Sequence, residues 1–216
     1  MAQIILALDY EQLDEALKTV RLLKDEISFF KVGLQLFTMY GPDAVKAVMS
    51  EGVEVFLDLK LHDIPNTCAL AVKSAEKLGC YSLTIHTKAG IEALRAAAEI
   101  RTVQQPRLWG VTALSSITGE DSISGAQLAL EAGLDGVIVS GDDTAKVKNR
   151  FPSLTIVTPG IRPSSYAKKD DQKKIMTPAM AVSSGADFLV IGRPIREADD
   201  PLAVTRAIKE EIKAHD

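Results

Sequence analysis

Apolar residues along the chain form short strand-like runs that alternate with stretches of helical spacing. Strand-like runs cover residues 4–8, 29–32, 108–114 and 154–158. Between the first two runs, apolar side chains recur at i, i+3, i+4 and i+7 from Leu13 to Leu23, as on one face of a helix. A second helix is predicted from about Pro42 to Ser50. The pattern therefore predicts that strands and helices alternate.

Four segments repeat one order: the end of a helix, a glycine, a short spacer and an apolar strand. They are SEGVEVFLD, KLGCYSLTIH, EAGLDGVIVS and SSGADFLVIG, with Gly52, Gly79, Gly133 and Gly185 as their glycines. Glycine often follows a helix because it adopts the left-handed conformation that caps the last turn. The glycines are 27, 54 and 52 residues apart, that is, one, two and two multiples of about 27, and one eighth of the 216-residue chain is also 27.

Eight strand–helix units predict an α/β protein, a (β/α)8 TIM barrel with residues 1–216 as a single domain. An open, doubly wound sheet also alternates strands and helices and is the rival architecture. The steady period, and a charge or turn glycine at the end of nearly every strand, favour the closed barrel. The fifth unit is the weakest, because turn residues fill residues 117–124 and the helix predicted near Ala126 to Ala132 is brief.

The composition is that of a soluble globular protein and argues against several function classes. The net charge is −4, so nothing overall attracts nucleic acid or an anionic membrane. No apolar run approaches the roughly 20 residues that span a bilayer, and the first residues do not form a signal peptide. Cys68 and Cys80 lack metal-binding spacing, and free thiols suit a reducing cytosol. We therefore expect a cytoplasmic protein without a nucleic-acid or membrane partner.

Polar residues gather where the strands are predicted to end, and in a (β/α)8 barrel those ends surround one mouth. The segment from Phe56 to Thr67, FLDLKLHDIPNT, contributes Asp58 and Lys60, which would project from one face of an extended strand, and then Asp63. The other strand ends carry Asp9, Lys31, His86, Thr87, Ser115, Ser116, Ser140 and Asp142. Lysines and carboxylates packed together keep one another ionised. The alternative is a salt-bridge network that only closes the top of the barrel.

This mixture of charges suits one kind of chemistry. A positioned ammonium is a proton donor to a carbanion. A carboxylate fixed beside a substrate carboxylate repels the ground state, and that repulsion is relieved as CO2 leaves. The segment around Asp58 and Lys60 is therefore predicted to be catalytic.

A Gly–Arg combination follows each of the last two predicted strands: Gly160 and Arg162 in TPGIRP, and Gly192 and Arg193 in IGRPI. The corresponding loops commonly bind phosphate in (β/α)8 enzymes. Glycine lets backbone N–H groups approach an anion, and arginine supplies two parallel N–H donors. The sequence therefore predicts a phosphate site. Residues 164–174 between these loops are predicted to form a lid over an anionic ligand, although a solvated run of charges explains its lysines nearly as well.

The histidines do not predict a metal site. His62, His86 and His215 lack metal-ligand spacing. The parity of His62 along its strand points it away from Asp58 and Lys60, so we expect it to make a structural hydrogen bond.

The motifs KVGLQLF, DLKLHDIPNT, TPGIRP and VIGRPI resemble the orotidine 5′-phosphate decarboxylase family, over nearly the whole chain and in the same order. DxKxxD alone is shared by a wider group of phosphosugar enzymes, whereas HDIPNT and TPGIRP are more specific. The resemblance implies conversion of orotidine 5′-phosphate (OMP) to UMP and CO2, the last step of UMP synthesis. It also implies a homodimer with shared active sites that uses no metal and no organic cofactor.

The resemblance further implies a role for each matching residue. Lys31, Asp58, Lys60 and Asp63 would be a catalytic tetrad. Lys60 would protonate C6 of the pyrimidine, Asp58 would lie against the departing carboxylate, and Lys31 would hold Asp58 and reach the ribose. Among the substrate-binding residues, Asp9 would bind a ribose hydroxyl and Ser115 the pyrimidine edge. Gln172, Gly192 and Arg193 would bind the phosphate, with Arg162 at the base of the lid. Ile64 and Thr67, together with Asp63, would reach into the partner's active site.

Two places depart from the family pattern. The family usually has H-A-x-G-G after strand four, whereas this chain reads His86-Thr87-Lys88-Ala89-Gly90, which puts an extra charge near the mouth. The connection after Ser115 is also shorter than in bacterial members.

Two other functions stay open. A related phosphosugar decarboxylase or aldolase would have a glutamate that helps to bind Mg²⁺ near the end of strand two, where this chain has Lys31, and an ammonium cannot ligate a metal. A non-catalytic nucleotide-binding barrel would not favour carboxylates crowded beside an anionic ligand.

Overall fold

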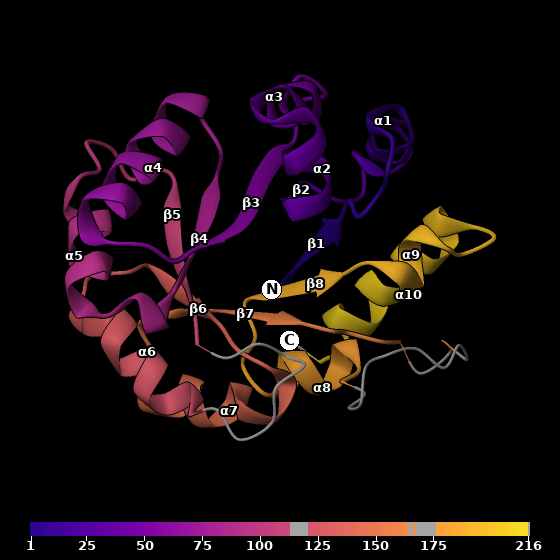
Figure 1. Cartoon of the computed structure of the whole chain (residues 1–216). Coiled ribbons are helices and arrows are strands. Elements are labelled where there is room, and N and C mark those ends of the chain that lie inside the picture. Colours follow the sequence, from indigo (N-terminus) through magenta and orange to yellow (C-terminus); the bar gives the residue numbers. More distant parts are fainter. Residues whose placement is uncertain (113–120, 164–165, 167–175, 216) are drawn as a thin grey trace.

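The computed structural model shows a closed barrel of eight parallel strands with helices packed around it (Figure 1). It describes residues 1–112, 121–163, 166 and 176–215. Each strand pairs with the next, and β8 (Phe188–Ile191) pairs with β1 (Gln3–Ala7) to close the barrel. The predicted (β/α)8 barrel is confirmed, and the open sheet is excluded because a doubly wound sheet leaves its edge strands unpaired.

The other strands are β2 (Phe29–Gly33), β3 (Glu54–Leu61), β4 (Ser82–His86), β5 (Arg107–Val111), β6 (Gly136–Ile138) and β7 (Thr155–Pro159). The helices are α1 (Leu13–Leu23), α2 (Leu34–Tyr40), α3 (Pro42–Met49), α4 (Pro65–Leu78), the 3-10 turn η1 (Thr87–Ala89), α5 (Ile91–Glu99), α6 (Ser122–Glu131), α7 (Gly141–Arg150), α8 (Pro178–Ser183), α9 (Arg193–Arg196) and α10 (Pro201–Lys213). The predicted bounds of β1, β2, β7 and α3 agree with these within one residue. Residues 113 and 114 of the predicted fifth strand lie outside the described residues.

The helix of the fifth unit differs from the prediction. Instead of a brief helix near Ala126 to Ala132, α6 begins at Ser122 and has 10 residues. The carboxylate of Asp121 caps it by accepting a hydrogen bond from the backbone N–H of Ile123 at 2.9 Å. Asp and Ser are common both in turns and at helix N-termini, so the composition of this stretch concealed the start of the helix.

The four repeat glycines take the left-handed conformation that the pattern predicts. Gly52, Gly79, Gly133 and Gly185 have φ angles of 81°, 84°, 77° and 88°. A side chain at such an angle would be strained, so glycine is the residue that reverses the chain from a helix into the following strand.

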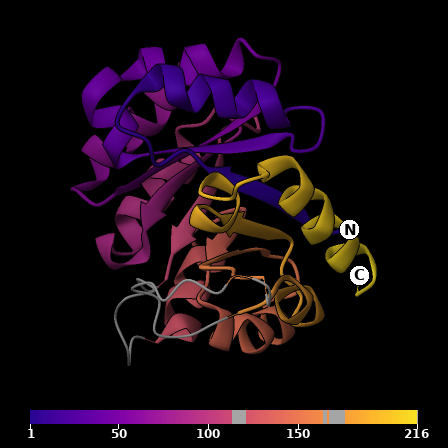
Figure 2. The same ribbon diagram turned by 90° about the vertical axis from the view of Figure 1, so that its right-hand side faces the viewer.

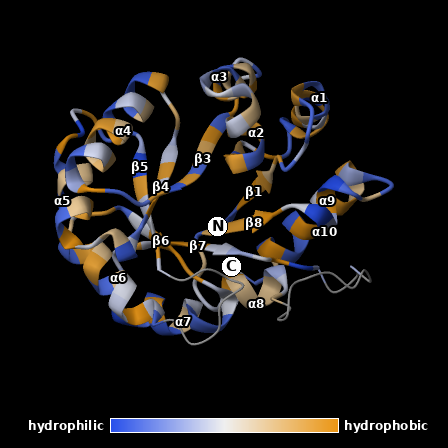
Figure 3. Cartoon of the chain, viewed as in Figure 1, coloured by the Kyte–Doolittle hydropathy of each residue, from blue (hydrophilic) through white to orange (hydrophobic). Residues whose placement is uncertain are grey.

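Strand side chains alternate between two cores. One lies inside the barrel and includes the large rings of Phe29, Phe56, Trp109 and Phe188, with the last two ring centroids 5.3 Å apart. The other lies between the barrel and the helices. Figure 3 shows this as hydrophobic strands at the centre and helices with mixed hydropathy around them. Because the interior is filled with rings, the open space lies at the carboxyl ends of the strands.

The last helix returns to the beginning of the chain. The N-terminus lies close to the end of α10 (Figure 2), and Glu26, just after α1, pairs with Arg206 and Lys209 of α10 at 2.8 and 2.7 Å. No helix in the described ranges is long and apolar enough to cross a membrane.

Candidate active site

A cavity of about 370 Å³ opens at the carboxyl ends of the barrel strands. Its apolar lining comes from Ala7, Phe56, Val111, Ile138, Pro159 and Val190. Its polar lining comes from Asp9, Lys31, Asp58, Lys60, Gly160, Arg162, Gly192, Arg193 and Arg196. The cavity therefore combines an apolar surface, suited to a flat ring, with many charged and polar groups that line the same space.

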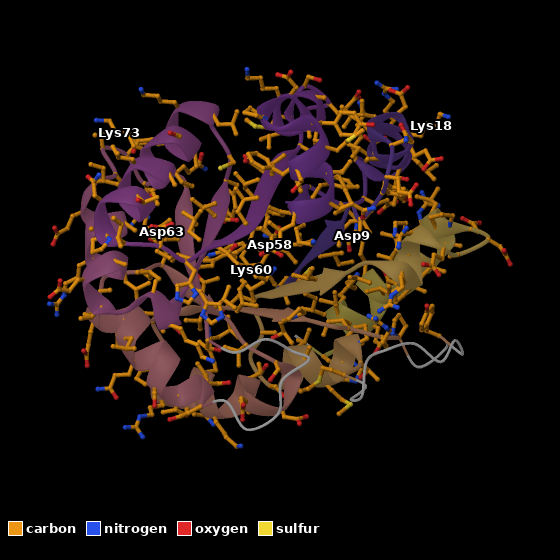
Figure 4. All side chains as sticks on the ribbon, in the orientation of Figure 1. Asp9, Lys18, Asp58, Lys60, Asp63 and Lys73 are labelled. Carbon is orange, nitrogen blue, oxygen red and sulfur yellow. The ribbon has the colours of Figure 1, made fainter. Side chains whose placement is uncertain are left out.

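Alternating charges from β1, β2 and β3 form a connected row. The ammonium of Lys60 lies 2.8 Å from Oδ2 of Asp58. The ammonium of Lys31 lies 3.9 Å from the same oxygen and 3.0 Å from Oδ1 of Asp9. Asp58 is only 9% exposed, and a buried carboxylate is tolerated when it is paired and hydrogen-bonded. Figure 4 shows Asp9, Asp58 and Lys60 around the centre of the mouth.

Thr84 on β4 makes a further hydrogen bond to the carboxylate of Asp58, and Thr84 was not predicted from the sequence. Its hydroxyl donates to Oδ1 of Asp58 at 2.9 Å and accepts from the backbone N–H of Lys60 at 2.8 Å. Thr84 is fully buried. The only signal in the sequence was a hydroxyl in an otherwise apolar strand, two residues before His86.

The backbone at Lys60 is not the extended strand that the sequence suggested. Its φ angle is 52°, in the left-handed region, and the pairing of β3 with β4 shifts register between Leu57 and Leu61. Such an irregularity bends a strand and re-aims a side chain. The side chains of Asp58 and Lys60 do meet, as expected, but through this bend and not through the pleat of a regular strand.

Asp63, Ile64 and Thr67 lie apart from the row of charges. All three are exposed near the start of α4, and none lines the cavity. The carboxylate of Asp63 accepts a hydrogen bond from the backbone N–H of Ile64 at 2.7 Å, and Figure 4 shows it away from Asp58 and Lys60. A single chain thus brings together three members of the predicted tetrad and leaves the fourth outside.

The predicted phosphate residues Arg162, Gly192 and Arg193 all line the cavity. Arg162 is 6% exposed, and its guanidinium donates to the carbonyl of Ile161 at 3.0 Å. The sequence missed a third guanidinium, that of Arg196, which lines the same cavity. Its signal was the second arginine of GRPIR, three residues after Arg193 and so on the same side of a helical turn.

Some predicted residues lie outside the described residues. They are Ser115, Gln172 and, apart from Tyr166, the predicted lid at residues 164–174. Tyr166 is described, and its ring lies 5.8 Å from the guanidinium carbon of Arg162.

The histidines near the mouth stack on each other. The ring centroids of His62 and His86 are 5.4 Å apart, and Nδ1 of His86 accepts from the backbone N–H of Lys88 at 3.3 Å. Neither histidine lines the cavity, nor does Lys88, the charge that departs from the family pattern. In the described part of the chain, no three His, Cys, Asp or Glu side chains are grouped to hold a metal ion.

Comparison with known proteins identifies similar sequences over almost the full length. The model of the Orotidine 5′-phosphate decarboxylase / HUMPS family matches residues 2–208. A protein of Nitratidesulfovibrio vulgaris (strain DP4) named orotidine 5′-phosphate decarboxylase is 43% identical, with 99% of each chain covered. One of the same name from Pseudomonas putida (strain W619) is 41% identical, with 98% of this chain and 97% of the relative covered.

Solved structures show the same likeness. The crystal structure of orotidine 5′-phosphate decarboxylase from Lactobacillus acidophilus matches with a TM-score of 0.85 and 33% identity, covering 98% of this chain and 99% of that one. The enzyme of the same name from Pyrococcus horikoshii OT3 matches with a TM-score of 0.83 and 29% identity, covering 98% and 99%.

Proposed function

The chain belongs to the Orotidine 5′-phosphate decarboxylase / HUMPS family, and from this premise we propose how its cavity converts OMP to UMP and CO2 as a carboxy-lyase. The observation that carries the proposal is the 2.8 Å contact between the ammonium of Lys60 and Asp58 in a cavity that also holds Arg162 and Arg193. A proton donor, a buried carboxylate and cations suited to a phosphate thus share one space.

The chemical step breaks the bond between C6 of the pyrimidine and its carboxylate. The electron pair stays on C6, CO2 leaves, and the ammonium of Lys60 gives its proton to C6; solvent then reprotonates the lysine. Asp58 lies against the departing carboxylate, so like charges destabilise the bound substrate more than the transition state. The fixed ammonium groups stabilise the developing carbanion without reorganising.

The remaining cavity residues position the substrate. Asp9 accepts from a ribose hydroxyl, and Lys31, held between Asp9 and Asp58, reaches the ribose while fixing Asp58. Arg162, Gly192 and Arg193 bind the phosphate, with Gln172 from the lid segment, and Ser115 binds the pyrimidine edge. We propose these roles without an organic cofactor or a metal ion.

We also propose that the enzyme is a homodimer in which Asp63, Ile64 and Thr67 complete the partner's active site. The support is exposed apolar surface near them: Ile64 is 66% exposed and Leu70, on the same helix, is 52% exposed. Large exposed apolar side chains of this kind mark interaction surfaces when they cluster. A cytoplasmic location remains a prediction from the sequence.

The test is the loss of OMP absorbance upon decarboxylation, measured for the wild type and for Lys60→Ala. We expect the variant to lose at least about a thousandfold in kcat, because the proton donor is gone. Lys73→Ala is the matched control, since Lys73 is exposed on the outer face of α4 (Figure 4). Near-normal turnover by Lys60→Ala would sink the mechanism.

Two further experiments test for a metal-dependent enzyme and for active sites shared between subunits. Wild-type turnover that disappears with EDTA would point to a metal-dependent phosphosugar enzyme. Activity recovered on mixing Lys60→Ala with Asp63→Ala protein would support shared sites, because a mixed dimer keeps one complete site; no recovery, with both variants dimeric, would contradict them.

A further inference from the structure

Arg196 shares the cavity with the predicted substrate-binding residues but has no role in the mechanism so far. It lies on α9, three residues after Arg193, and lines the cavity together with Asp9 and Gly192. Among the described residues, its guanidinium makes one ion pair, at 3.3 Å to Glu197, its neighbour in the chain. An ion pair between neighbouring, partly exposed side chains contributes little, so it does not explain why this arginine faces the cavity.

The guanidinium of Arg196 is held in place by an aromatic ring. Its central carbon lies 5.1 Å from the centroid of the Tyr10 ring. The hydroxyl of Tyr10 is in turn hydrogen-bonded to the hydroxyl of Thr19 on α1, at 2.7 Å. A stacked guanidinium keeps its in-plane N–H donors available at its edges. The ring therefore fixes the orientation of Arg196 and leaves its donors for another group.

One of those donors is unsatisfied. The Nε atom of Arg196 is buried and makes no hydrogen bond to any residue in the described part of the chain. A buried donor without an acceptor is destabilising, and native structures rarely keep one without a reason. Burial also keeps Nε out of reach of a ligand, so the terminal amino groups of Arg196, which lines the cavity, are the donors that a ligand can meet.

The charge of the cavity is also suited to an anionic ligand. Among the described residues of one chain, its lining holds five cationic side chains, Lys31, Lys60, Arg162, Arg193 and Arg196, and two carboxylates, Asp9 and Asp58, which gives these residues a net charge of +3. The proposed substrate carries a carboxylate and a phosphate of about −2 at neutral pH, about −3 in total. The lysines lie beside the carboxylates, whereas the arginines all come from the β7 and β8 side.

We propose that Arg196 is a further phosphate-binding residue, which donates from its terminal amino groups to the phosphate oxygens while Tyr10 holds its plane. The inference rests on the proposed function, since OMP supplies the phosphate. It assigns Arg196 to the phosphate because Asp58 and Lys60 already flank the position of the carboxylate.

The experiment compares kcat/KM for OMP with kcat/KM for orotidine, the same molecule without the phosphate. Arg196→Met should lower the value for OMP by roughly tenfold to hundredfold, the effect of one charge-assisted hydrogen-bonding group, and leave the value for orotidine unchanged. Arg196→Lys keeps the charge but not the planar fork and should show a smaller loss, again only with OMP. Tyr10→Leu should do the same, because the guanidinium is then less well oriented.

Arg206→Met is the matched control, since Arg206 is an exposed arginine on α10 whose partner is Glu26, away from the cavity. It should change neither substrate's value. Equal losses for OMP and orotidine in Arg196→Met and Arg196→Lys would overturn the inference and assign Arg196 a structural role. A wild type that does not decarboxylate OMP would instead overturn the proposed function, so the two failures are distinguishable.

Discussion

Asp58 receives two different hydrogen bonds, one from the ammonium of Lys60 and one from the hydroxyl of Thr84. The first comes from the group that is proposed to give up a proton during the reaction, whereas the second comes from a hydroxyl that keeps its proton. Thr84 also accepts from the backbone N–H of Lys60. A single neutral hydroxyl therefore ties the carboxylate to the backbone of Lys60, the proposed proton donor, which suggests a positioning role for Thr84.

We predict that Thr84→Val, which keeps the shape of the side chain, lowers kcat by roughly tenfold to hundredfold, the effect of a hydrogen bond to a charged group. The value of KM should change much less, because Thr84 does not line the cavity. Steady-state kinetics on OMP measure both constants. Thr84→Ser is the control and should stay close to the wild type. A Thr84→Val enzyme with normal kcat and a lowered Tm would show that Thr84 serves stability alone.

The sequence predicted charged residues of this cavity better than neutral ones. Asp58, Lys60 and Lys31 were recognisable because a charge at the end of an apolar strand needs a reason. Thr84 carried no such signal, since threonine is common in strands and its partner is 26 residues away in the chain. Arg196 was visible as a residue, but only the three-dimensional structure shows that it turns toward the cavity and not toward solvent.

At the scale of elements, β3 differs from the other seven strands by the bend at Lys60. This is the only non-glycine residue with positive φ in the described ranges. A left-handed conformation costs a residue with a side chain roughly 1–2 kcal/mol, whereas glycine adopts it freely. The strand thus accepts local strain at the residue that is proposed to give the proton, a placement that occurs often at active sites.

The strain predicts a reversal of the usual ranking of glycine and alanine in a strand. At a regular strand position, glycine is less stable than alanine by roughly 0.5–1 kcal/mol. At Lys60 we expect Lys60→Gly to be more stable than Lys60→Ala, by up to about 1 kcal/mol, or a few degrees in Tm for a chain of this size. Both variants lack the proton donor, so thermal and urea unfolding compare their backbones alone.

Leu59 provides the matched pair for this comparison, because it lies in the same strand and its φ is not positive. There, Leu59→Gly should be the less stable of the Gly and Ala variants. The same order at both positions would mean that the bend at Lys60 stores no strain.

Secondary-structure elements could be predicted where they belong to the repeat, and less well where only a few local residues determine them. The period of about 27 residues and the four turn glycines predicted the barrel, because a glycine that reverses the chain must adopt an unusual φ. The bend at Lys60 was not predictable, since FLDLKLH reads as a regular strand. The separate helix α2 was missed as well, because LQLFTMY lacks a polar start signal and α3 follows it after Gly41.

At the scale of the whole molecule, ion pairs between distant segments clamp the outer layer. Glu26, after α1, accepts from Arg206 and Lys209 of α10, more than 175 residues away in the sequence. Glu51, after α3, accepts from Arg21 of α1 at 2.8 Å. The contacts of Glu26 join the first and last units of the barrel, where the ring of helices closes, and the contact of Glu51 joins the first and second units. The sequence contained these charges, but their pairing depends on barrel closure and was not predictable.

The ion pairs of Glu26 with Arg206 and Lys209 predict how the stability of the protein depends on pH. Hydrogen bonds from Lys209 and then Arg206 hold the pKa of Glu26 below its ordinary value. Because the folded-state pKa is the lower one, this contribution to stability is present above the unfolded pKa of about 4.3 and is lost as the pH falls through the folded value. We therefore expect Glu26→Gln to be less stable than the wild type at pH 7, and the difference to shrink below about pH 4.

Urea unfolding of both proteins between pH 7 and pH 3 measures this difference directly, since the linear extrapolation gives a free energy at each pH. Glu210→Gln is the control, because Glu210 is an exposed glutamate on the same helix as Arg206 and Lys209; its curve should run parallel to that of the wild type. A Glu26→Gln difference that stays constant down to pH 3 would mean that packing of the side chain, and not its charge, joins α10 to the start of the barrel. A difference in stability that disappears at low pH would show that the charge of Glu26 stabilises the contact between the eighth unit of the barrel and the first.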